Sequence, residues 1–204
     1  MKKFKKIVIA SRSPAKRKRY GRLMAGMADE ILSFSNLEIE GKPDESGETA
    51  EENAQIKARF YSQRTNLPVF SEDEALCVDF LSSDKQPGVH VRRIEGKSEV
   101  SDDELFAYWE KIVARVPKEK RTGYWYVAYC LLIPGGKIKT MAIDYPITFF
   151  SPSSKIRIPG WPMSSLEGPT KFGKPHSELN NEERQEMERK HNASILKKLQ
   201  ELLD

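Results

Sequence analysis

Two apolar patterns alternate along this chain, and their order predicts the fold class. A β-branched run at residues 6–10 predicts a buried strand. Residues 14–28 follow with apolar side chains at helical spacing, and Ser13 and Pro14 suit the cap and first position of that helix. A strand, a tight turn and a helix in this order are typical of α/β proteins.

Three further helices are predicted by pairs that can form a capping box. The pairs are Thr49 with Glu52, Ser101 with Glu104, and Asn180 with Glu183. The first helix should run to about residue 64, the second should end before Pro117, and the third carries the apolar face of the carboxyl terminus.

The remaining apolar runs predict strands. Short runs at 69–71 and 76–81 predict two strands around an acidic turn at 72–74. Long runs at 124–133 and 137–150 are separated by Pro134-Gly135-Gly136, which predicts a hairpin. Hairpin strands are antiparallel, so a mixed sheet is expected. Residues 151–174 are rich in Pro, Gly and Ser and predict a functional or mobile loop.

Length and composition place the chain in a broad class. Its 204 residues suffice for one domain over residues 1–204. No apolar run approaches the roughly 20 residues that cross a bilayer, and no signal peptide is evident. Cys77 and Cys130 lie in apolar runs, which is typical of reduced core residues in a cytoplasmic protein.

The net charge of +4 hides an uneven distribution. No Asp or Glu precedes Asp29, while Lys and Arg are frequent there; acids dominate residues 38–52. The simplest interpretation is two solvated faces of opposite sign. A polyphosphate held with a metal ion would also suit the pattern. Nucleic-acid binding is less favoured, because only Phe4 and Tyr20 interleave aromatic rings with the cations.

Three segments carry candidate chemistry. The helix after Ser13 can bind phosphate through its amino-terminal N–H groups, with Lys16 adding a charge in the first turn. Asn53 and Lys57 share a helical face near the loop residue Glu45, as a magnesium–triphosphate site requires. Residues 72–74 can hold magnesium or activate water. Alone, each segment is equally explained by a capped helix, a salt-bridged surface helix or an acidic turn.

Together, and in this order, the segments resemble the inosine triphosphate pyrophosphatase family. The family's first turn, Thr-Gly-Asn-x-x-Lys, is matched by residues 11–16, and its Glu-Asn-Ala-x-x-Lys-Ala helix by residues 52–58. Its acidic turn is matched by residues 72–77, and its Pro-Gly stretch by Pro87-Gly88-Val89. The resemblance implies a long twisted mixed sheet with flanking helices, two lobes with a central cleft, and a homodimer.

The resemblance also implies roles for individual residues. Asp73 and Glu72 would be catalytic; Ser13, Lys16, Asn53, Lys57, Trp161 and His191 would bind substrate; Glu45 and Asp73 would bind Mg²⁺. Carboxylates position a water and the metal, while the metal and lysines neutralise charge developing on phosphorus.

The base-reading half departs from the family. The family's Gly-Phe-Gly-Trp/Tyr-Asp-Pro loop is replaced by residues 158–162, and its Ser-His-Arg by Lys190-His191-Asn192. Trp161 is interpreted either as a base-stacking ring or as a loop anchor, and His191 either as a base donor or as a surface residue. A preference for inosine triphosphate is therefore expected to be weak or redirected.

The expected function is hydrolysis of a nucleoside triphosphate, with non-standard or modified nucleotides among the candidates, to the monophosphate and pyrophosphate. The alternative is a catalytically weak nucleotide-binding or regulatory protein on the same fold, which the altered base-reading segments favour. Joint retention of Glu45, Asp73, Lys16 and Lys57 favours the enzyme.

Overall fold

The computed structural model describes residues 4–97, 99–136 and 138–203. Its chain divides into two compact units. The first contains Met1–Glu74, Val127–Ile143 and Arg189–Asp204, and the second contains Ala75–Tyr126 and Asp144–Glu188. Within the described residues, no helix has the length and apolar character needed to span a membrane.

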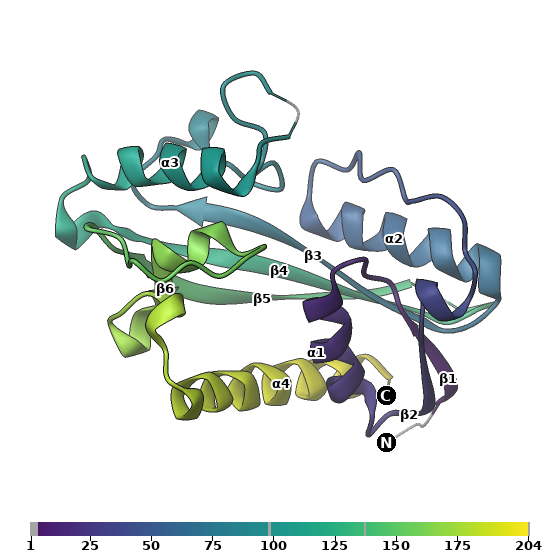
Figure 1. Ribbon diagram of the computed structural model, residues 1–204. Helices are drawn as coiled ribbons and strands as arrows, with labels where there is room; N and C mark the ends of the chain where they lie inside the picture. The colour runs from purple at the N-terminus through teal and green to yellow at the C-terminus, as the bar shows by residue number, and fades with distance from the viewer. Residues whose placement is uncertain (1–3, 98, 137, 204) are drawn as a thin grey trace. The chain divides into compact units, whose positions relative to one another are not determined.

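The described part of the chain forms a six-stranded sheet in the order β2-β1-β3-β4-β5-β6 (Figure 1). The strands are β1 (Phe4–Ile9), β2 (Ala28–Ser33), β3 (Val69–Val78), β4 (Thr122–Leu132), β5 (Ile138–Phe149) and β6 (Glu167–Pro169). β1 pairs in parallel with β2 and β3, whereas β5 and β6 are antiparallel. The predicted mixed sheet is therefore confirmed.

Four α-helices occur among the described residues, and their predicted starting points are confirmed. They are α1 (Pro14–Met24), α2 (Ala50–Thr65), α3 (Asp102–Val113) and α4 (Asn181–Leu203). Ser13 caps α1, and capping boxes begin α2 and α3. Asn180 and Glu183 exchange side-chain and backbone hydrogen bonds at the start of α4. Cap chemistry therefore located four helix starts from sequence.

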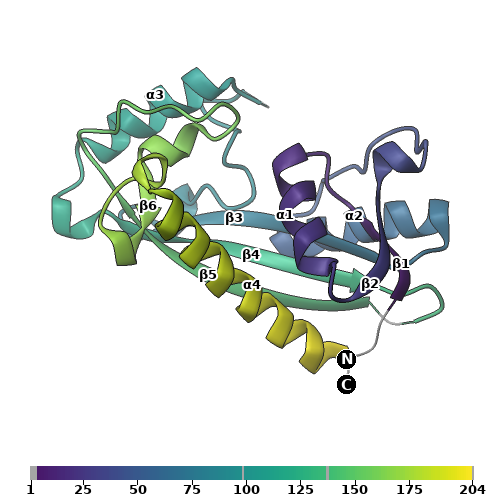
Figure 2. The same ribbon diagram turned by 60° about the horizontal axis from the view of Figure 1, so that its bottom comes forward.

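The first unit packs helices on both faces of β1 and β3. Figures 1 and 2 show α2 on one side of these strands and α1 on the other. Val8, Val69 and Cys130 form a core with Ala54 and Ala58 of α2. On the opposite face, Tyr20 of α1 makes edge contacts with Phe70 and Tyr129. Period-two alternation along the strands thus supplies a separate core to each helix.

The second unit has its own core around Trp109 of α3. Trp109 stacks on Phe149 of β5, and Leu76, Leu105 and Leu166 are buried in the same cluster. The segment 151–174, predicted as a loop, contains a 3-10 turn at Pro162–Ser165 and strand β6. Its loop prediction was therefore partly wrong, because Met163 and Leu166 tie it to the core.

Two further strand predictions were wrong. Residues 72–74 do not form a turn: β3 continues through them to Val78. β2 was missed altogether, because Asp29 and Glu30 interrupt its apolar run at exposed positions. The hairpin is confirmed, because β4 and β5 are adjacent in the sheet. Lys137, the expected first residue of its second strand, lies outside the described residues. Cys77 and Cys130 are both free.

Candidate functional site

Strand β3 presents acidic side chains to both faces of the sheet. Ser71 and Asp73 point toward α2, where the Ser71 hydroxyl donates to the carbonyl oxygen of Ala54 at 2.6 Å. Glu72 and Glu74 point toward α1 and contact Lys16. The run that resembled a turn is thus a strand whose successive carboxylates alternate between two helices.

Lys16 lies in the first turn of α1, against the sheet face that carries Glu72 and Glu74. Its Nζ is 3.0 Å from Glu72 Oε1 and 3.2 Å from Glu74 Oε1. Burial alone would lower the pKa of Lys16, but these two carboxylates outweigh it and raise the pKa well above its ordinary value. Lys16 is therefore a fixed positive charge beside the cap residue Ser13, whose hydroxyl accepts the Lys16 backbone N–H.

Lys57 of α2 lies against the other face and meets three oxygens. Its Nζ is 2.6 Å from Asp73 Oδ1, 2.9 Å from Glu45 Oε2 and 3.1 Å from the backbone oxygen of Glu72. Burial would lower the pKa of Lys57, yet the surrounding acids, Asp73 foremost, raise it. The three oxygen atoms around the Lys57 ammonium form a local environment that favours a positive charge.

Glu72 and Asp73 are adjacent in sequence but differ in acidity. Only 3% of the Glu72 side chain is exposed; burial would raise its pKa, but Lys16 and Lys57 lower it below the ordinary value. Burial raises the pKa of Asp73, and Lys57 offsets this only in part because Glu72 and Glu45 repel the carboxylate. Glu72 is therefore a buried counter-ion, whereas Asp73 is the better placed proton acceptor.

Asn53 and Gly47 shape the loop that carries Glu45. Asn53 is buried, and its amide accepts the Gly47 N–H at 2.9 Å and donates to the Gly47 oxygen at 3.3 Å. A side chain at Gly47 would come within 2.8 Å of Asn53 Oδ1, so this close approach requires glycine. These contacts give Asn53 a positioning role for the loop; its predicted substrate contact stays a prediction.

We call the six side chains Lys16, Lys57, Glu45, Glu72, Asp73 and Glu74 the acid–lysine cluster. Its four carboxylates exceed its two ammonium groups by two negative charges. Glu45 and Asp73 offer the hard oxygen ligands that Mg²⁺ prefers, and magnesium keeps most of its waters, so about two carboxylates suffice. No group of three or more His, Cys, Asp or Glu side chains with metal-binding spacing occurs among the described residues. The donor set fits a hydrated, substrate-shared ion rather than an all-protein cage.

Neither Trp161 nor His191 belongs to this cluster. Trp161 belongs to the second unit, is 43% exposed, and makes an edge contact with His176. His191 lies on α4 in the first unit, where its Nδ1 is 3.3 Å from a guanidinium nitrogen of Arg19. Their predicted contacts with a base stay predictions.

Sequence reasoning missed two participants. Glu74 was considered only as one of three acids on an expected turn, and its contact with Lys16 was not predicted. Assigning residues 71–74 to a strand would have revealed it, since Glu72 and Glu74 then share a face. Arg19 was counted only as part of a basic stretch, and nothing in the sequence signals its contact with a helix 172 positions away.

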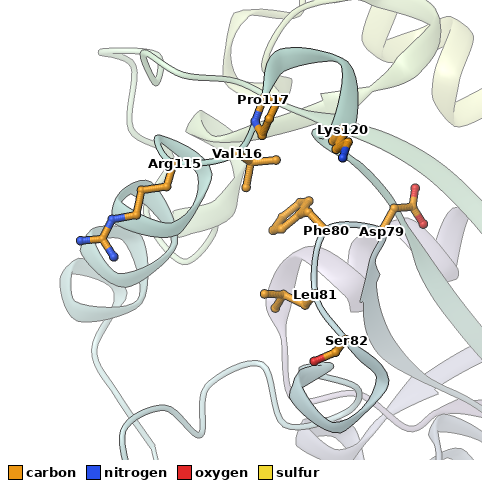
Figure 3. Close-up of a pocket in the computed structure, with 8 residues that line it drawn as sticks. All are labelled: Asp79, Phe80, Leu81, Ser82, Arg115, Val116, Pro117 and Lys120. Carbon is orange, nitrogen blue, oxygen red and sulfur yellow. The ribbon is translucent and has the colours of Figure 1, made fainter.

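The second unit contains a cavity of about 470 Å³ (Figure 3). Phe80 and Val116 face one another across it, and Arg115 extends away from them in the view shown. Lys120 lies at its edge. None of the predicted site residues lines this cavity, so it contributes nothing to the candidate chemistry.

Known proteins resemble this chain over most of its length. The Ham1 family model matches residues 7–144, which include the whole acid–lysine cluster. A Thermoanaerobacter sp. (strain X514) protein named dITP/XTP pyrophosphatase is 32% identical over 147 residues, covering 69% of this chain and 73% of the relative. The Bacillus subtilis (strain 168) protein of the same name is 28% identical over 214 residues, covering 98% of each.

Solved structures agree on the fold. The Staphylococcus aureus Ham1 protein superposes with a TM-score of 0.76 at 20% identity, covering 97% of this chain and 98% of that one. A nucleoside-triphosphatase, also titled dITP/XTP pyrophosphatase, from Mycobacterium abscessus gives a TM-score of 0.74 at 24% identity, covering 94% and 97%. At these identities the likeness establishes a shared fold.

Proposed function

The chain belongs to the Ham1 family, and from this premise we propose that it hydrolyses nucleoside triphosphates to the monophosphate and pyrophosphate. The relatives named dITP/XTP pyrophosphatases support this assignment. The single observation that carries it is the acid–lysine cluster, in which three acids of β3 meet one lysine from α1 and one lysine from α2. The expected alternative, a nucleotide-binding or regulatory protein, is tested by the same experiment.

The roles follow from charge and burial. Lys16 lies in the first turn of α1, where the N–H groups and dipole favour phosphate oxygens. Ser13 adds a hydroxyl beside it, and Lys57 adds a second charge from α2. A bound triphosphate would compete for both lysines with the carboxylates that now hold them. Each lysine can therefore exchange a carboxylate partner for a phosphate partner of the same sign.

Asp73 is the proposed base that orients the attacking water. Its raised pKa brings its proton affinity closer to that of a useful general base than an ordinary aspartate has. Glu72 stays ionised beneath it and holds Lys16 in place. Glu45 and Asp73 would hold Mg²⁺, which when bound neutralises charge on the phosphates. Attack of this water on the α-phosphorus would break its bond to the oxygen that bridges to the β-phosphorus, so that pyrophosphate leaves and the monophosphate keeps the oxygen of the water.

The decisive experiment measures products, not only turnover. The purified chain is incubated with Mg²⁺ and a panel of standard, deaminated and modified nucleoside triphosphates, and pyrophosphate and orthophosphate are quantified separately. We expect pyrophosphate in equal amounts with the nucleoside monophosphate, and loss of both in excess chelator or in Asp73→Asn. Orthophosphate as the first product, or nucleotide binding without turnover across the panel, would overturn the proposal.

A homodimer in the cytoplasm is also proposed, on the resemblance alone. The measurement is light scattering of the purified protein, which should give twice the 23.4 kDa chain mass. A mass equal to one chain at micromolar concentration contradicts it.

A further inference from the structure

Two arginines near the start of α1, which we call the arginine pair, rest on one aromatic ring. The guanidinium carbon of Arg12 lies 5.1 Å from the centroid of the Phe34 ring, and that of Arg17 lies 5.0 Å from it. Arg12 donates to the backbone oxygen of Gly41 at 3.3 Å. Arg17 donates to the backbone oxygens of Ser11 and Arg12, at 3.4 and 2.6 Å. The ring and the carbonyl oxygens therefore hold two positive charges close together.

The arginine pair differs from the lysines of the acid–lysine cluster in having no acidic partner. Lys16 and Lys57 each contact two carboxylates. Among the residues that the structure describes, no Asp or Glu forms an ion pair with either guanidinium, and the oxygen atoms that they contact are backbone carbonyls. The protein itself therefore does not relieve the repulsion between the two guanidinium groups. An anion bound by both would relieve it, so the pair is suited to a negatively charged ligand.

The sheet places the arginine pair and the acids of β3 on either side of β1. Ile9, at the end of β1, pairs with Ser33 of β2 and with Phe70 of β3, so the residues beyond these three lie at one edge of the sheet. Phe34, which carries the pair, follows Ser33, and Asp73 lies just beyond Phe70. Two strand spacings, roughly 10 Å, separate β2 from β3. Open α/β sheets bind ligands at this edge, outside the carboxyl ends of their parallel strands.

The charges of the arginine pair and of the acid–lysine cluster act on the same buried hydroxyl. Burial raises the pKa of Tyr61 on α2, and the positive charges of Arg12 and Arg17 oppose this rise. Two members of the cluster act on the same pKa, because Glu45 raises it and Lys57 lowers it. The pair and the cluster are therefore close enough to interact with one bound polyphosphate.

The net charge of the acid–lysine cluster makes a further positive group necessary. Its four carboxylates exceed its two ammonium groups by two negative charges. A triphosphate with one Mg²⁺ is also negative, so the cluster alone would repel the complex that it is proposed to bind. Arg12 and Arg17 supply two positive charges, which equal the excess of the cluster.

We propose that Arg12 and Arg17 are specificity-determining residues that bind the leaving pyrophosphate, at the end of the substrate farthest from Asp73. The proposal rests on the proposed function. Asp73 and its water must lie at the α-phosphorus, so a triphosphate that crosses the end of β1 carries its last two phosphates toward β2 and the arginine pair. Guanidinium groups match phosphate oxygens with parallel N–H donors. They also neutralise the charge that pyrophosphate gains when its bond to the α-phosphorus breaks.

The first test measures the binding of inorganic pyrophosphate and requires no turnover. Isothermal titration calorimetry in the presence of Mg²⁺ compares the wild type with Arg12→Met and Arg17→Met. Each substitution removes a contact between two charged groups, so the dissociation constant of pyrophosphate should rise about tenfold to a hundredfold. Arg12→Lys and Arg17→Lys keep the charge and lose only the paired donors, so each should weaken binding less than the methionine variant does.

Arg64→Met is the matched control for this measurement. The Arg64 guanidinium also lies on a phenylalanine, 3.6 Å from the centroid of Phe60, but it belongs to the last turn of α2. Its loss should change the dissociation constant by less than about twofold. A wild type that does not bind pyrophosphate, or equal affinities in the wild type, Arg12→Met and Arg17→Met, would overturn the proposal.

The second test uses the two products as inhibitors of nucleoside triphosphate hydrolysis. Arg12→Met and Arg17→Met should raise the inhibition constant of pyrophosphate about tenfold or more, and that of the nucleoside monophosphate less than about twofold. Equal increases for both products would mean that the arginines only support the fold, and would overturn the assignment. A wild type that hydrolyses no nucleoside triphosphate, yet binds pyrophosphate through the arginine pair in calorimetry, would defeat the proposed function and still support the binding site.

Discussion

Lys16 and Lys57 are both engaged by carboxylates, and this affects how their loss should be measured. Lys16 has two acidic partners and Lys57 has two, plus a backbone oxygen. Removing either ammonium leaves acids that repel one another and repel an incoming triphosphate. Each lysine therefore serves the free protein as a counter-ion and the substrate as a phosphate ligand.

We predict that Lys16→Ala and Lys57→Ala each lower kcat/KM by about tenfold to a hundredfold, because a hydrogen bond to a charged group contributes about 1.5–3 kcal/mol. The exposed cations Lys18 and Arg59 on the same two helices supply the matched controls. Lys18→Ala and Arg59→Ala should change kcat/KM less than threefold. Steady-state kinetics with circular dichroism check both points, and full activity in both cluster variants would contradict the phosphate roles.

The acidity of Asp73 predicts a pH profile. A base must be ionised to act, and burial raises the pKa of Asp73 above its ordinary value of 3.8. Activity should therefore fall with decreasing pH at a higher pH than an unperturbed aspartate would give. The measurement is kcat/KM against pH at limiting Mg²⁺, because a cation bound at Asp73 would itself lower that pKa. Asp73→Glu should move the acidic limb, whereas an acidic limb at the ordinary aspartate value would count against Asp73 as the base.

At the scale of elements, the Glu45 loop depends on one close approach to α2. Gly47 exchanges hydrogen bonds with the Asn53 amide, and Glu52 completes the capping box with Thr49. Glu45, two residues before Gly47, reaches Lys57 from this loop. The helix cap, the loop and the proposed metal ligand therefore form one local structure.

We predict that Gly47→Ala displaces this loop, because the new methyl carbon would lie 2.7 Å from Glu52 Cβ and 2.8 Å from Asn53 Oδ1. Overpacking of this kind costs about 1–3 kcal/mol of stability. Gly21→Ala is the control: nothing lies within 4 Å of its added methyl group, and the helix should gain about 1 kcal/mol. The melting temperature should fall in Gly47→Ala and rise in Gly21→Ala. Only Gly47→Ala should raise the Mg²⁺ concentration needed for half-maximal activity. A Gly47→Ala protein with unchanged melting and activity would refute the account.

Helix starts were predictable from the sequence because a cap is a local device. Thr49 with Glu52, and Ser101 with Glu104, satisfy N–H groups within one turn, so their spacing alone identifies them. The continuation of β3 through residues 72–74 could not be predicted from neighbouring residues alone. Three consecutive acids are unfavourable in an isolated strand, and they are compensated by lysines 56 and 16 positions away. The site residues could be identified by resemblance, but their distribution over two faces needed the fold.

The whole molecule divides its predicted functions between the two units. The acid–lysine cluster lies entirely in the first unit, and Trp161 lies in the second. The second unit also carries exposed apolar side chains at Ile156 and Trp161. The altered base-reading segments are therefore distributed over both units, while the proposed phosphate chemistry is confined to one.

For both units acting together we predict only a modest preference among purine bases. The family's loop aspartate and the arginine after His191 are absent, so fewer polar groups would be left unpaired by a wrong base. A ring at Trp161 would stack on any base, contributing about 1–3 kcal/mol without discrimination. The ratio of kcat/KM between inosine and guanosine or adenosine triphosphates should stay below about a hundredfold, or about 2.7 kcal/mol. A larger preference would show that other residues read the base.

The alternation along β3 has a consequence for how this gene can vary. Substituting one acid changes one contact, but deleting or inserting one codon between Ser71 and Ala75 moves every downstream side chain to the opposite face. Glu74 would then meet α2, and Leu76 would leave its core. Length changes in these five codons should be eliminated by selection even where individual acids are exchanged, so the spacing of the charges is inherited more strictly than their identity.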